Sequence, residues 1–142
     1  MARMASAATE TQLREETERW VLPLVGREVD QLCIDFAVTL VVDGTDTVRL
    51  AIPFTLELDG QVHTVEPERA ETMLPVLGLH RAVVTAAAAG KDGTLELRFD
   101  GDRVLRCEPN NDYEAWEVGG GLPPVTSSYH ILAQAGGGVE VI

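Results

Sequence analysis

Four Asp-Gly dipeptides beside runs of alternating apolar and polar residues constrain the fold of this chain more than any other feature. They lie at residues 43–44, 59–60, 92–93 and 100–101. An Asp-Gly pair suits the tight turn of a β-hairpin, because glycine, and to a lesser extent aspartate, adopts the positive φ that such turns require. The sequence therefore predicts an antiparallel meander of strands joined by short turns.

The last of these turns joins two runs whose register can be argued from the residues alone. A two-residue loop would place Leu95 opposite Arg106 and mix the two faces of the hairpin. A three-residue loop, 100–102, instead places Leu97 opposite Leu105 and Leu95 opposite Cys107. Because a slip of one residue exchanges the faces of a strand, we predict the three-residue loop, with its glycine at positive φ.

The same alternation predicts strands along most of the chain. They are expected over 28–35, 37–42, 48–58, 61–65, 81–89 and 112–118, followed by a hairpin of 129–135 and 139–142 around three glycines. Pro53 cannot donate a hydrogen bond to a ladder, so the strand that contains it is expected at an edge or with a bulge. The segment 81–89 has valines that favour a strand and alanines that favour a helix, and continuity with the next hairpin favours the strand. Residues 119–124 are expected to form a mobile loop.

Two segments have helical rather than alternating character. Residues 9–20 are rich in helix formers, with Leu13 and Trp20 on one face, and predict a short N-terminal helix. Residues 67–77 begin with a proline and acids, which favour a helix start. The residues expected to point inward there are Ala70, Met73, Leu74 and Leu77. The predicted fold class is α+β: an antiparallel β meander curled or doubled into a sandwich, with these two helices. Residues 1–8 are expected to be a disordered leader and 9–142 a single domain.

The charge balance narrows the function classes. The chain has 23 acidic and 11 basic residues, for a net charge of −12. Such a chain repels phosphate backbones and anionic membranes, so neither nucleic acid nor a membrane is an expected partner, whereas a basic protein is. No apolar run is long enough to span a bilayer, and no secretory signal is recognised, so a cytoplasmic location is expected. The charge also has a simpler interpretation, that it keeps the protein in solution.

No motif indicates a cofactor, a metal or catalysis. Cys33 and Cys107 belong to no C-x-x-C pair, and two reduced core thiols are favoured over a disulfide or a metal site. The three histidines, His63, His80 and His130, have no metal-ligand spacing. No nucleophile-elbow or phosphate-cradling glycine motif is present either, so we expect no enzyme.

The densest cluster of aromatic and acidic residues is the candidate binding site. It consists of Asp112, Tyr113, Glu114, Trp116 and Glu117. Since neighbours on a strand alternate, one ring is expected in the core and the other near the surface. Two interpretations stay open: two packing aromatics, or an exposed aromatic ringed by carboxylates that binds an Arg- or Lys-bearing partner.

Several stretches resemble a family of small, uncharacterised actinobacterial domains. They are W-V-L-P-L-V-G-R at 20–27, D-G-T-L-E-L-R-F at 92–99, E-P-N-N-D-Y-E-A-W-E-V at 108–118 and the glycine-rich C-terminal hairpin. The resemblance covers about residues 20–142, and its most specific part is the Y-E-A-W element, 113–116. It implies no established activity. Similar small acidic bacterial domains often act as immunity proteins for secreted toxins.

The leading hypothesis is a non-enzymatic interaction domain with an acidic, aromatic-containing face, in its sharpest form immunity-like. The alternative is a small-molecule-binding domain with a pocket between the sheet and the helix at 67–77. A homodimer could form by strand pairing, at the edge near Pro53 or at the terminal hairpin.

Overall fold

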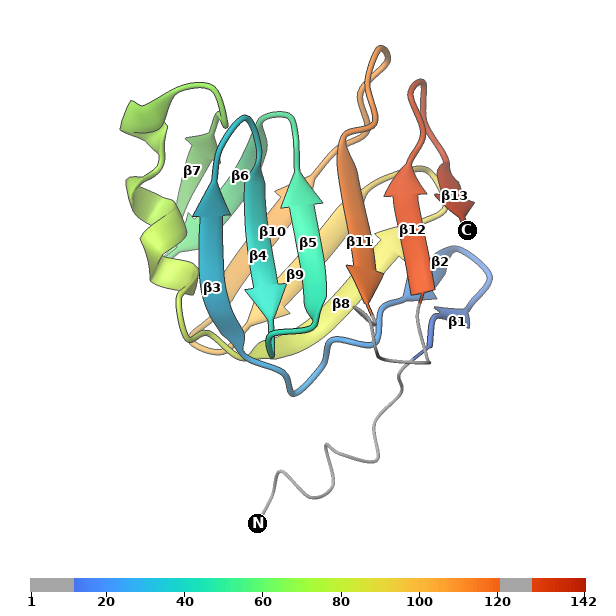
Figure 1. The fold of residues 1–142 in the computed structure, drawn as a ribbon, viewed down its shortest axis with the longest axis horizontal. Coiled ribbons are helices and arrows are strands. Elements are labelled where there is room, and N and C mark those ends of the chain that lie inside the picture. The colour runs from blue at the N-terminus through green and yellow to red at the C-terminus, as the bar shows by residue number, and fades with distance from the viewer. Residues whose placement is uncertain (1–11, 121–128) are drawn as a thin grey trace.

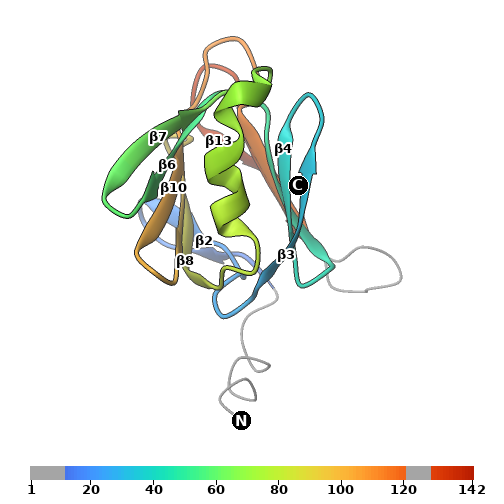
Figure 2. The ribbon, with the colours of Figure 1, turned by 90° about the vertical axis from the view of Figure 1, so that its left-hand side faces the viewer.

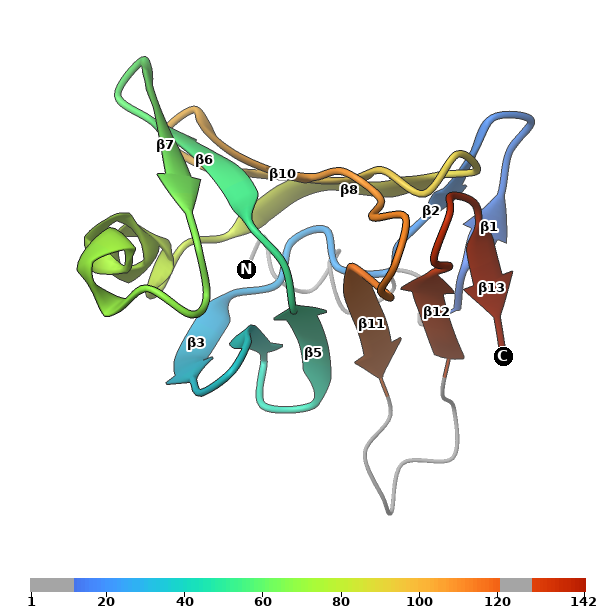
Figure 3. The ribbon, with the colours of Figure 1, turned by 90° about the horizontal axis from the view of Figure 1, so that it is seen from above.

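Two antiparallel β-sheets packed face to face form the described part of the chain, residues 12–120 and 129–142 of a computed structural model (Figures 1 and 3). The seven-stranded sheet has the order β1 (Arg14–Glu15), β2 (Arg19–Val21), β8 (Val84–Gly90), β9 (Leu95–Phe99), β10 (Arg103–Cys107), β6 (Phe54–Leu58), β7 (Gln61–Val65). The six-stranded sheet has the order β13 (Val139–Val141), β12 (Tyr129–Ala133), β11 (Trp116–Gly120), β5 (Asp46–Leu50), β4 (Val38–Val42), β3 (Val29–Ile34).

The core lies between the two sheets. Strand β4 shows how the alternation builds it, because Val38, Leu40 and Val42 are buried while the residues between them are only half-buried. Side chains of this kind from both sheets form one apolar cluster. Facing sheets bury their apolar sides in this way in β-sandwiches.

The predicted α+β class is wrong, because every strand pair is antiparallel and the described residues contain no α-helix. In place of the helix at 67–77 there are two 3₁₀ segments, η1 (Ala70–Thr72) and η2 (Leu74–Leu79). Figure 2 shows them closing one side of the sandwich, between β7 and β3.

The inward residues of η2 explain the error. A 3₁₀-helix repeats every three residues, and Met73, Val76 and Leu79 are accordingly buried. The prediction assumed the α-helical period, so Leu74 and Leu77 were expected inward but are exposed. Ala70 is exposed as well, which leaves Met73 as the one correct assignment of the four.

The N-terminal helix expected over 9–20 is also wrong in the part that the structure describes. Strands β1 and β2 form a hairpin there, and Trp20 lies opposite Ala89 of β8. The Lys91 ammonium lies 5.9 Å from the centroid of the Trp20 ring, close enough for a cation–π interaction. Pairing with β8 therefore overrides the helical preference of this segment. The leader predicted at 1–8 lies outside the described residues.

The strand predicted over 48–58 is in fact two strands in different sheets. Strand β5 ends at Leu50, and β6 begins at Phe54 on the opposite sheet. Pro53 lies in the crossing between them, where its missing N–H costs no ladder bond. Strand β6 lies between β10 and β7, and its pairing has no register shift, so both predicted explanations of the proline, an edge strand or a bulge, are wrong.

Other predictions are confirmed. Strands β9 and β10 have the predicted register, with Leu97 opposite Leu105 and Leu95 opposite Cys107. Gly101 has a φ of 74°, as the three-residue loop requires. The ambiguous segment at 81–89 is a strand from residue 84 onward, as β8 runs from Val84 to Gly90, and the C-terminal hairpin is formed by β12 and β13.

Neither cysteine forms a disulfide. Cys107 is fully buried in the core, while Cys33 is half-buried on β3. Burial raises the pKa of the Cys107 thiol to about 12, with a smaller effect from the charge of Glu108. Within residues 12–120 and 129–142, no helix has the length and apolar character needed to cross a bilayer.

Alkylation should distinguish the two thiols. Because the thiolate is the reactive form, Cys107 should resist iodoacetamide at pH 8 in the folded protein and react only after unfolding. Peptide mass mapping of native and urea-unfolded samples measures this. Modification of Cys107 in the native sample at the rate of the unfolded one would contradict its position in the core.

Candidate functional site

Trp116 is a core residue. Its ring is buried between the sheets, and its Nε1 donates a hydrogen bond of 2.8 Å to the carbonyl oxygen of Gly93. Of the two open interpretations of the aromatic cluster, packing is therefore correct for this ring. Trp116 offers no surface to a partner.

Tyr113 lies outside the sandwich on the loop between β10 and β11, with 66% of its surface exposed. The strand predicted over 112–118 begins only at Trp116, so Tyr113 is not on a strand. One buried ring and one exposed ring were expected, and this is confirmed. The reason differs, because the exposed ring belongs to a loop and not to the opposite face of a strand.

Asn110 holds the loop that carries Tyr113. Its side-chain Oδ1 accepts hydrogen bonds from the backbone N–H groups of Asp112, at 2.8 Å, and of Tyr113, at 3.1 Å. Its carbonyl oxygen accepts a third, from the N–H of Gly136 at 2.8 Å. An asparagine that bonds its own backbone in this way fixes a turn. The loop that carries Tyr113 is therefore held in place by hydrogen bonds.

Phe36 is presented in a similar way from the turn between β3 and β4. The Asp35 side chain accepts a hydrogen bond from the N–H of Ala37 at 2.8 Å, and the Asp35 N–H donates to the Ala37 carbonyl at 3.0 Å. Ala37 is fully buried, so the turn is anchored in the core while Phe36 is 85% exposed.

An open cleft of about 610 Å³ lies between these two loops. It is lined by Phe36, Ala51, Ile52, Pro53, Glu68, Asn110, Tyr113 and Glu114. Residues 51–53 and 110–114 come from two connections in which the chain passes between the sheets, β5 to β6 and β10 to β11. We call this the Phe36–Tyr113 cleft.

Two carboxylates in the cleft carry unbalanced charge. Glu68 and Glu114 make no ion pair or side-chain hydrogen bond with any residue of 12–120 or 129–142. The nearby cation in sequence, Arg69, is already held by Glu66 at 3.1 Å and Glu71 at 3.0 Å. The hydrogen bond and charge of Glu71, with the charge of Glu66, raise the pKa of Arg69. The cleft therefore combines exposed aromatic surface with free negative charge.

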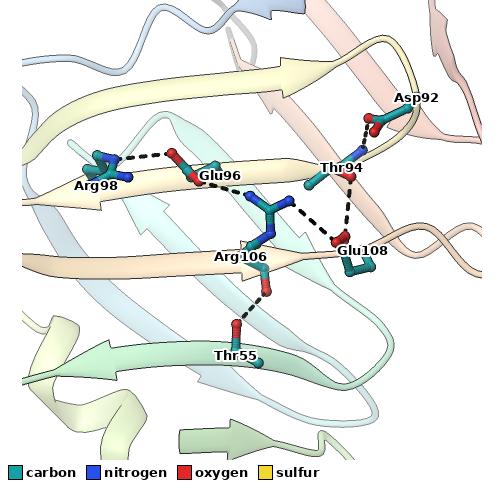
Figure 4. Close-up of polar contacts among 7 residues, drawn as sticks. All are labelled: Thr55, Asp92, Thr94, Glu96, Arg98, Arg106 and Glu108. Carbon is teal, nitrogen blue, oxygen red and sulfur yellow. Dashed lines mark hydrogen bonds and ion pairs between the residues drawn. The ribbon is translucent and has the colours of Figure 1, made fainter. Parts of the chain in front are cut away.

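The outer face of the seven-stranded sheet offers a contrast (Figure 4). Arg106 lies between Glu96, at 3.1 Å, and Glu108, at 3.5 Å. Arg98 also contacts Glu96, at 3.1 Å. Exposed pairs of this kind contribute about 0–1 kcal/mol each to stability. The charges of these two arginines and two glutamates are therefore matched within the sheet, whereas the two carboxylates of the cleft are not.

The structure separates the five predicted binding residues. Tyr113 and Glu114 line the cleft, and Asp112 lies in the same loop. Trp116 is in the core, and Glu117 follows it on the outer face of the six-stranded sheet. There the Glu117 carboxylate lies 2.8 Å from Nε2 of His130. No group of three or more potential metal ligands is found among the described residues.

Sequence reasoning missed three important cleft residues, Phe36, Glu68 and Asn110. The Asn-Asn-Asp run at 110–112 is a turn signal that could have located the loop of Tyr113. Phe36, an aromatic residue between Asp35 and the next strand, could likewise have been assigned to a turn. For Glu68 no local signal exists, because only the path of the chain around the sandwich brings it to the cleft.

The ligand pocket expected between the sheet and residues 67–77 has no support. Met73, Val76 and Leu79 fill the space between η2 and the sheets. A smaller hollow of about 300 Å³ beside Gly78 and Arg103 is open to solvent. The Arg103 guanidinium in it is already bound to Asp100, at 2.6 Å, and to the Gly78 carbonyl.

Comparison with known proteins gives one match. The model of a family described as "Family of unknown function (DUF6188)" matches residues 20–142. No curated protein and no solved structure matches. The extent agrees with the resemblance found in the sequence. The actinobacterial origin and the importance of the Y-E-A-W element stay predictions.

Substitution of Trp116 and of Tyr113 should show, from the change in the free energy of unfolding, that the first is a core residue and the second a surface residue of the cleft. Trp116→Ala should lower the free energy of unfolding by about 3–5 kcal/mol, because it removes a buried ring and leaves the Gly93 carbonyl without its donor. Tyr113→Ala should change it by less than about 0.5 kcal/mol, as expected for an exposed side chain. Urea denaturation followed by circular dichroism measures both. Similar losses for the two variants would show that Tyr113 is also structural.

Proposed function

We propose that this chain, which belongs to DUF6188, a family of unknown function, is a non-enzymatic interaction domain. It holds a basic segment of a partner protein in the Phe36–Tyr113 cleft. The observation that supports the proposal is that two exposed aromatic rings, each on a turn held by hydrogen bonds, lie in the same cleft as two carboxylates that form no ion pair with the described residues. The proposal keeps the cytoplasmic location expected from the sequence.

The aromatic rings favour binding over a purely structural role. An aromatic ring that is exposed in the folded protein does not contribute the stabilisation that its burial would give. Aromatic residues are also enriched at the sites where partner proteins bind. Phe36 and Tyr113 stand on turns that are fixed by side-chain hydrogen bonds and anchored in the core. Little conformational entropy would be lost when a partner contacts them, and such preorganisation favours affinity.

The chemistry of the cleft favours arginine as the central residue of the partner. A guanidinium group stacks on aromatic faces and forms paired hydrogen bonds with carboxylates. Tyr113 and Glu114 offer both kinds of contact from one loop, and Glu68 adds a second carboxylate from another segment. The net charge of −12 would speed the approach of a basic partner.

The absence of catalysis is part of the proposal. The side chains of the cleft that can ionise are Glu68, Tyr113 and Glu114, and the proposal assigns all three to binding a cationic side chain. An immunity-like role, in which a basic secreted toxin is the partner, is the sharpest form of the proposal and is supported by the acidic charge.

Binding of defined peptides tests the proposal. Fluorescein-labelled octapeptides from a combinatorial library should bind when they contain arginine, and their Arg→Gln counterparts should not. Affinity should fall as salt is raised, because exposed charges are screened. The double variant Glu68→Gln, Glu114→Gln should bind about tenfold more weakly, a loss of about 1.4 kcal/mol.

A matched control variant distinguishes the effect of the cleft carboxylates on binding from the effect of the overall negative charge. The double variant Glu57→Gln, Glu140→Gln removes the same charge from two exposed carboxylates outside the cleft. It should bind the peptides as the wild type does. Equal losses in both double variants, or no arginine-dependent binding at all, would contradict the proposal. Preferential binding of small organic cations would favour a small-molecule function instead.

A further inference from the structure

Strand β7 has an edge unlike the other sheet edges of the described chain. Edge strands carry unpaired backbone N–H and C=O groups that can pair with another chain, and proteins usually guard them with charges, prolines, bulges or short length. Strand β7, Gln61–Val65, has the sequence Q-V-H-T-V, with no proline, no carboxylate and no Lys or Arg. No register irregularity interrupts its pairing with β6.

The remaining edges are guarded. Strand β1 is two residues long and both are charged. Strand β13 has three residues, of which the central one is Glu140. Strand β3 contains Asp30 and a bulge between Val29 and Gln31, and the backbone of Val29 is already paired with Arg81 and Ala82.

The β6–β7 hairpin determines which groups of β7 are free. Leu58 and Gln61 flank the two-residue Asp59-Gly60 turn, whose φ values of 51° and 78° fit a type I′ turn. The backbone of Gln61 therefore faces β6. Because the ladder alternates, the N–H and C=O groups of Val62 and Thr64 face outward.

Apolar side chains lie beside this edge, together with the exposed carboxylates of Glu57, opposite Val62, and of Asp59 in the turn. The Val62 side chain is 65% exposed, and Leu74 and Leu77 are exposed on neighbouring η2. Figure 2 shows β7 and η2 on the same side of the molecule. The first carboxylate after the strand, Glu66, is already paired with Arg69.

We infer that β7 pairs with the β7 of a second copy, in antiparallel orientation, and so joins two seven-stranded sheets into one. A two-fold axis at His63 would place Val62 opposite Thr64 of the other copy. Both residues have outward-facing backbone groups, and their side chains lie on the same face. Each of the two such pairs could then exchange two backbone hydrogen bonds.

The pairing geometry supports a second copy as the occupant. The two-fold axis at His63 matches the outward backbone groups of Val62 with those of Thr64 in the other copy, and the strand carries no Asp, Glu, Lys or Arg. Two chains of net charge −12 repel each other, but at physiological salt this repulsion extends over only about 8 Å, so an edge strand without carboxylates is where it opposes pairing least. This location replaces those suggested by the sequence, because β6 near Pro53 is interior and β13 carries Glu140.

Analytical ultracentrifugation over about a thousandfold range of protein concentration tests the inference. The full chain should show a monomer–dimer equilibrium. Thr64→Pro, which removes the outward N–H and leaves the β6 ladder intact, should weaken dimerisation about tenfold or more. Val62→Lys should weaken it as well, by placing a hydrated charge on the edge, whereas Val141→Lys on β13 is the matched control and should not.

Cross-linking tests the register. In a background with Cys33→Ser, His63→Cys should form an intermolecular disulfide, because non-hydrogen-bonded pairs on a two-fold axis bring their Cβ atoms close together. A protein that stays monomeric, or a dimer unaffected by both Thr64→Pro and Val62→Lys, would overturn the inference. So would a dimer that Val141→Lys disrupts to the same extent.

Salt and Tyr113 distinguish this inference from the proposed function. Raising the salt concentration should strengthen dimerisation, since it screens the repulsion between two acidic copies, but it should weaken binding of basic peptides. Tyr113→Ala should abolish peptide binding and leave the dimer unchanged. The two can therefore fail separately.

Discussion

The hydrogen bond from Trp116 to the Gly93 carbonyl ties together the two sheets and the loop that presents Tyr113. Trp116 belongs to β11 of the six-stranded sheet, and Gly93 lies in the turn between β8 and β9 of the other. A side chain at Gly93 could not be accommodated, since its φ is 105° and an added Cβ would lie 2.9 Å from Cβ of Pro109. The same turn accepts a hydrogen bond from Gly138 at the Asp92 carbonyl. A buried ring with a satisfied N–H thus fixes the spacing of the sandwich at this end.

The cleft lies where the chain changes sheets. The connection from β5 to β6 and the connection from β10 to β11 both cross between the sheets, and both contribute residues to its lining. They are held to each other, because the N–H of Ala51 donates to the carbonyl of Ala115. Loops at the end of a rigid sandwich can carry varied side chains without disturbing the core. The cleft is therefore a natural place for binding residues in this fold.

Charge has different consequences at the cleft and at the β7 edge. In the cleft, Glu68 and Glu114 add local negative charge to an acidic molecule and favour a basic occupant. At β7 the lack of charged side chains in the strand is the distinctive feature, and it lessens the repulsion of another acidic chain. On the outer face of the seven-stranded sheet, Arg98 and Arg106 balance the charges of Glu96 and Glu108. The same composition thus gives three surfaces that differ in their local charge.

The sequence by itself determined the features that depend on neighbours in the chain. Alternation and the Asp-Gly turns gave the strands and the register of β9 with β10, because a slip would turn Leu95 and Leu97 to the wrong face. They could also show that one of Tyr113 and Trp116 would be buried. Tertiary structure decided the rest. Periodicity reports which residues share a face and not which sheet they join, so the split of 48–58 at Pro53 was hidden.

The same limit explains the helices and the candidate site. Pairing with β8 made a strand of residues 19–21, and packing against the sheets selected the three-residue period of η2 over the α-helical one. Glu68, Phe36 and Tyr113 are far apart in the sequence and meet only because the two sheets bring their ends together. Contacts between distant segments have no local pattern, so the sequence located the loop of Tyr113 and only the tertiary structure located the cleft.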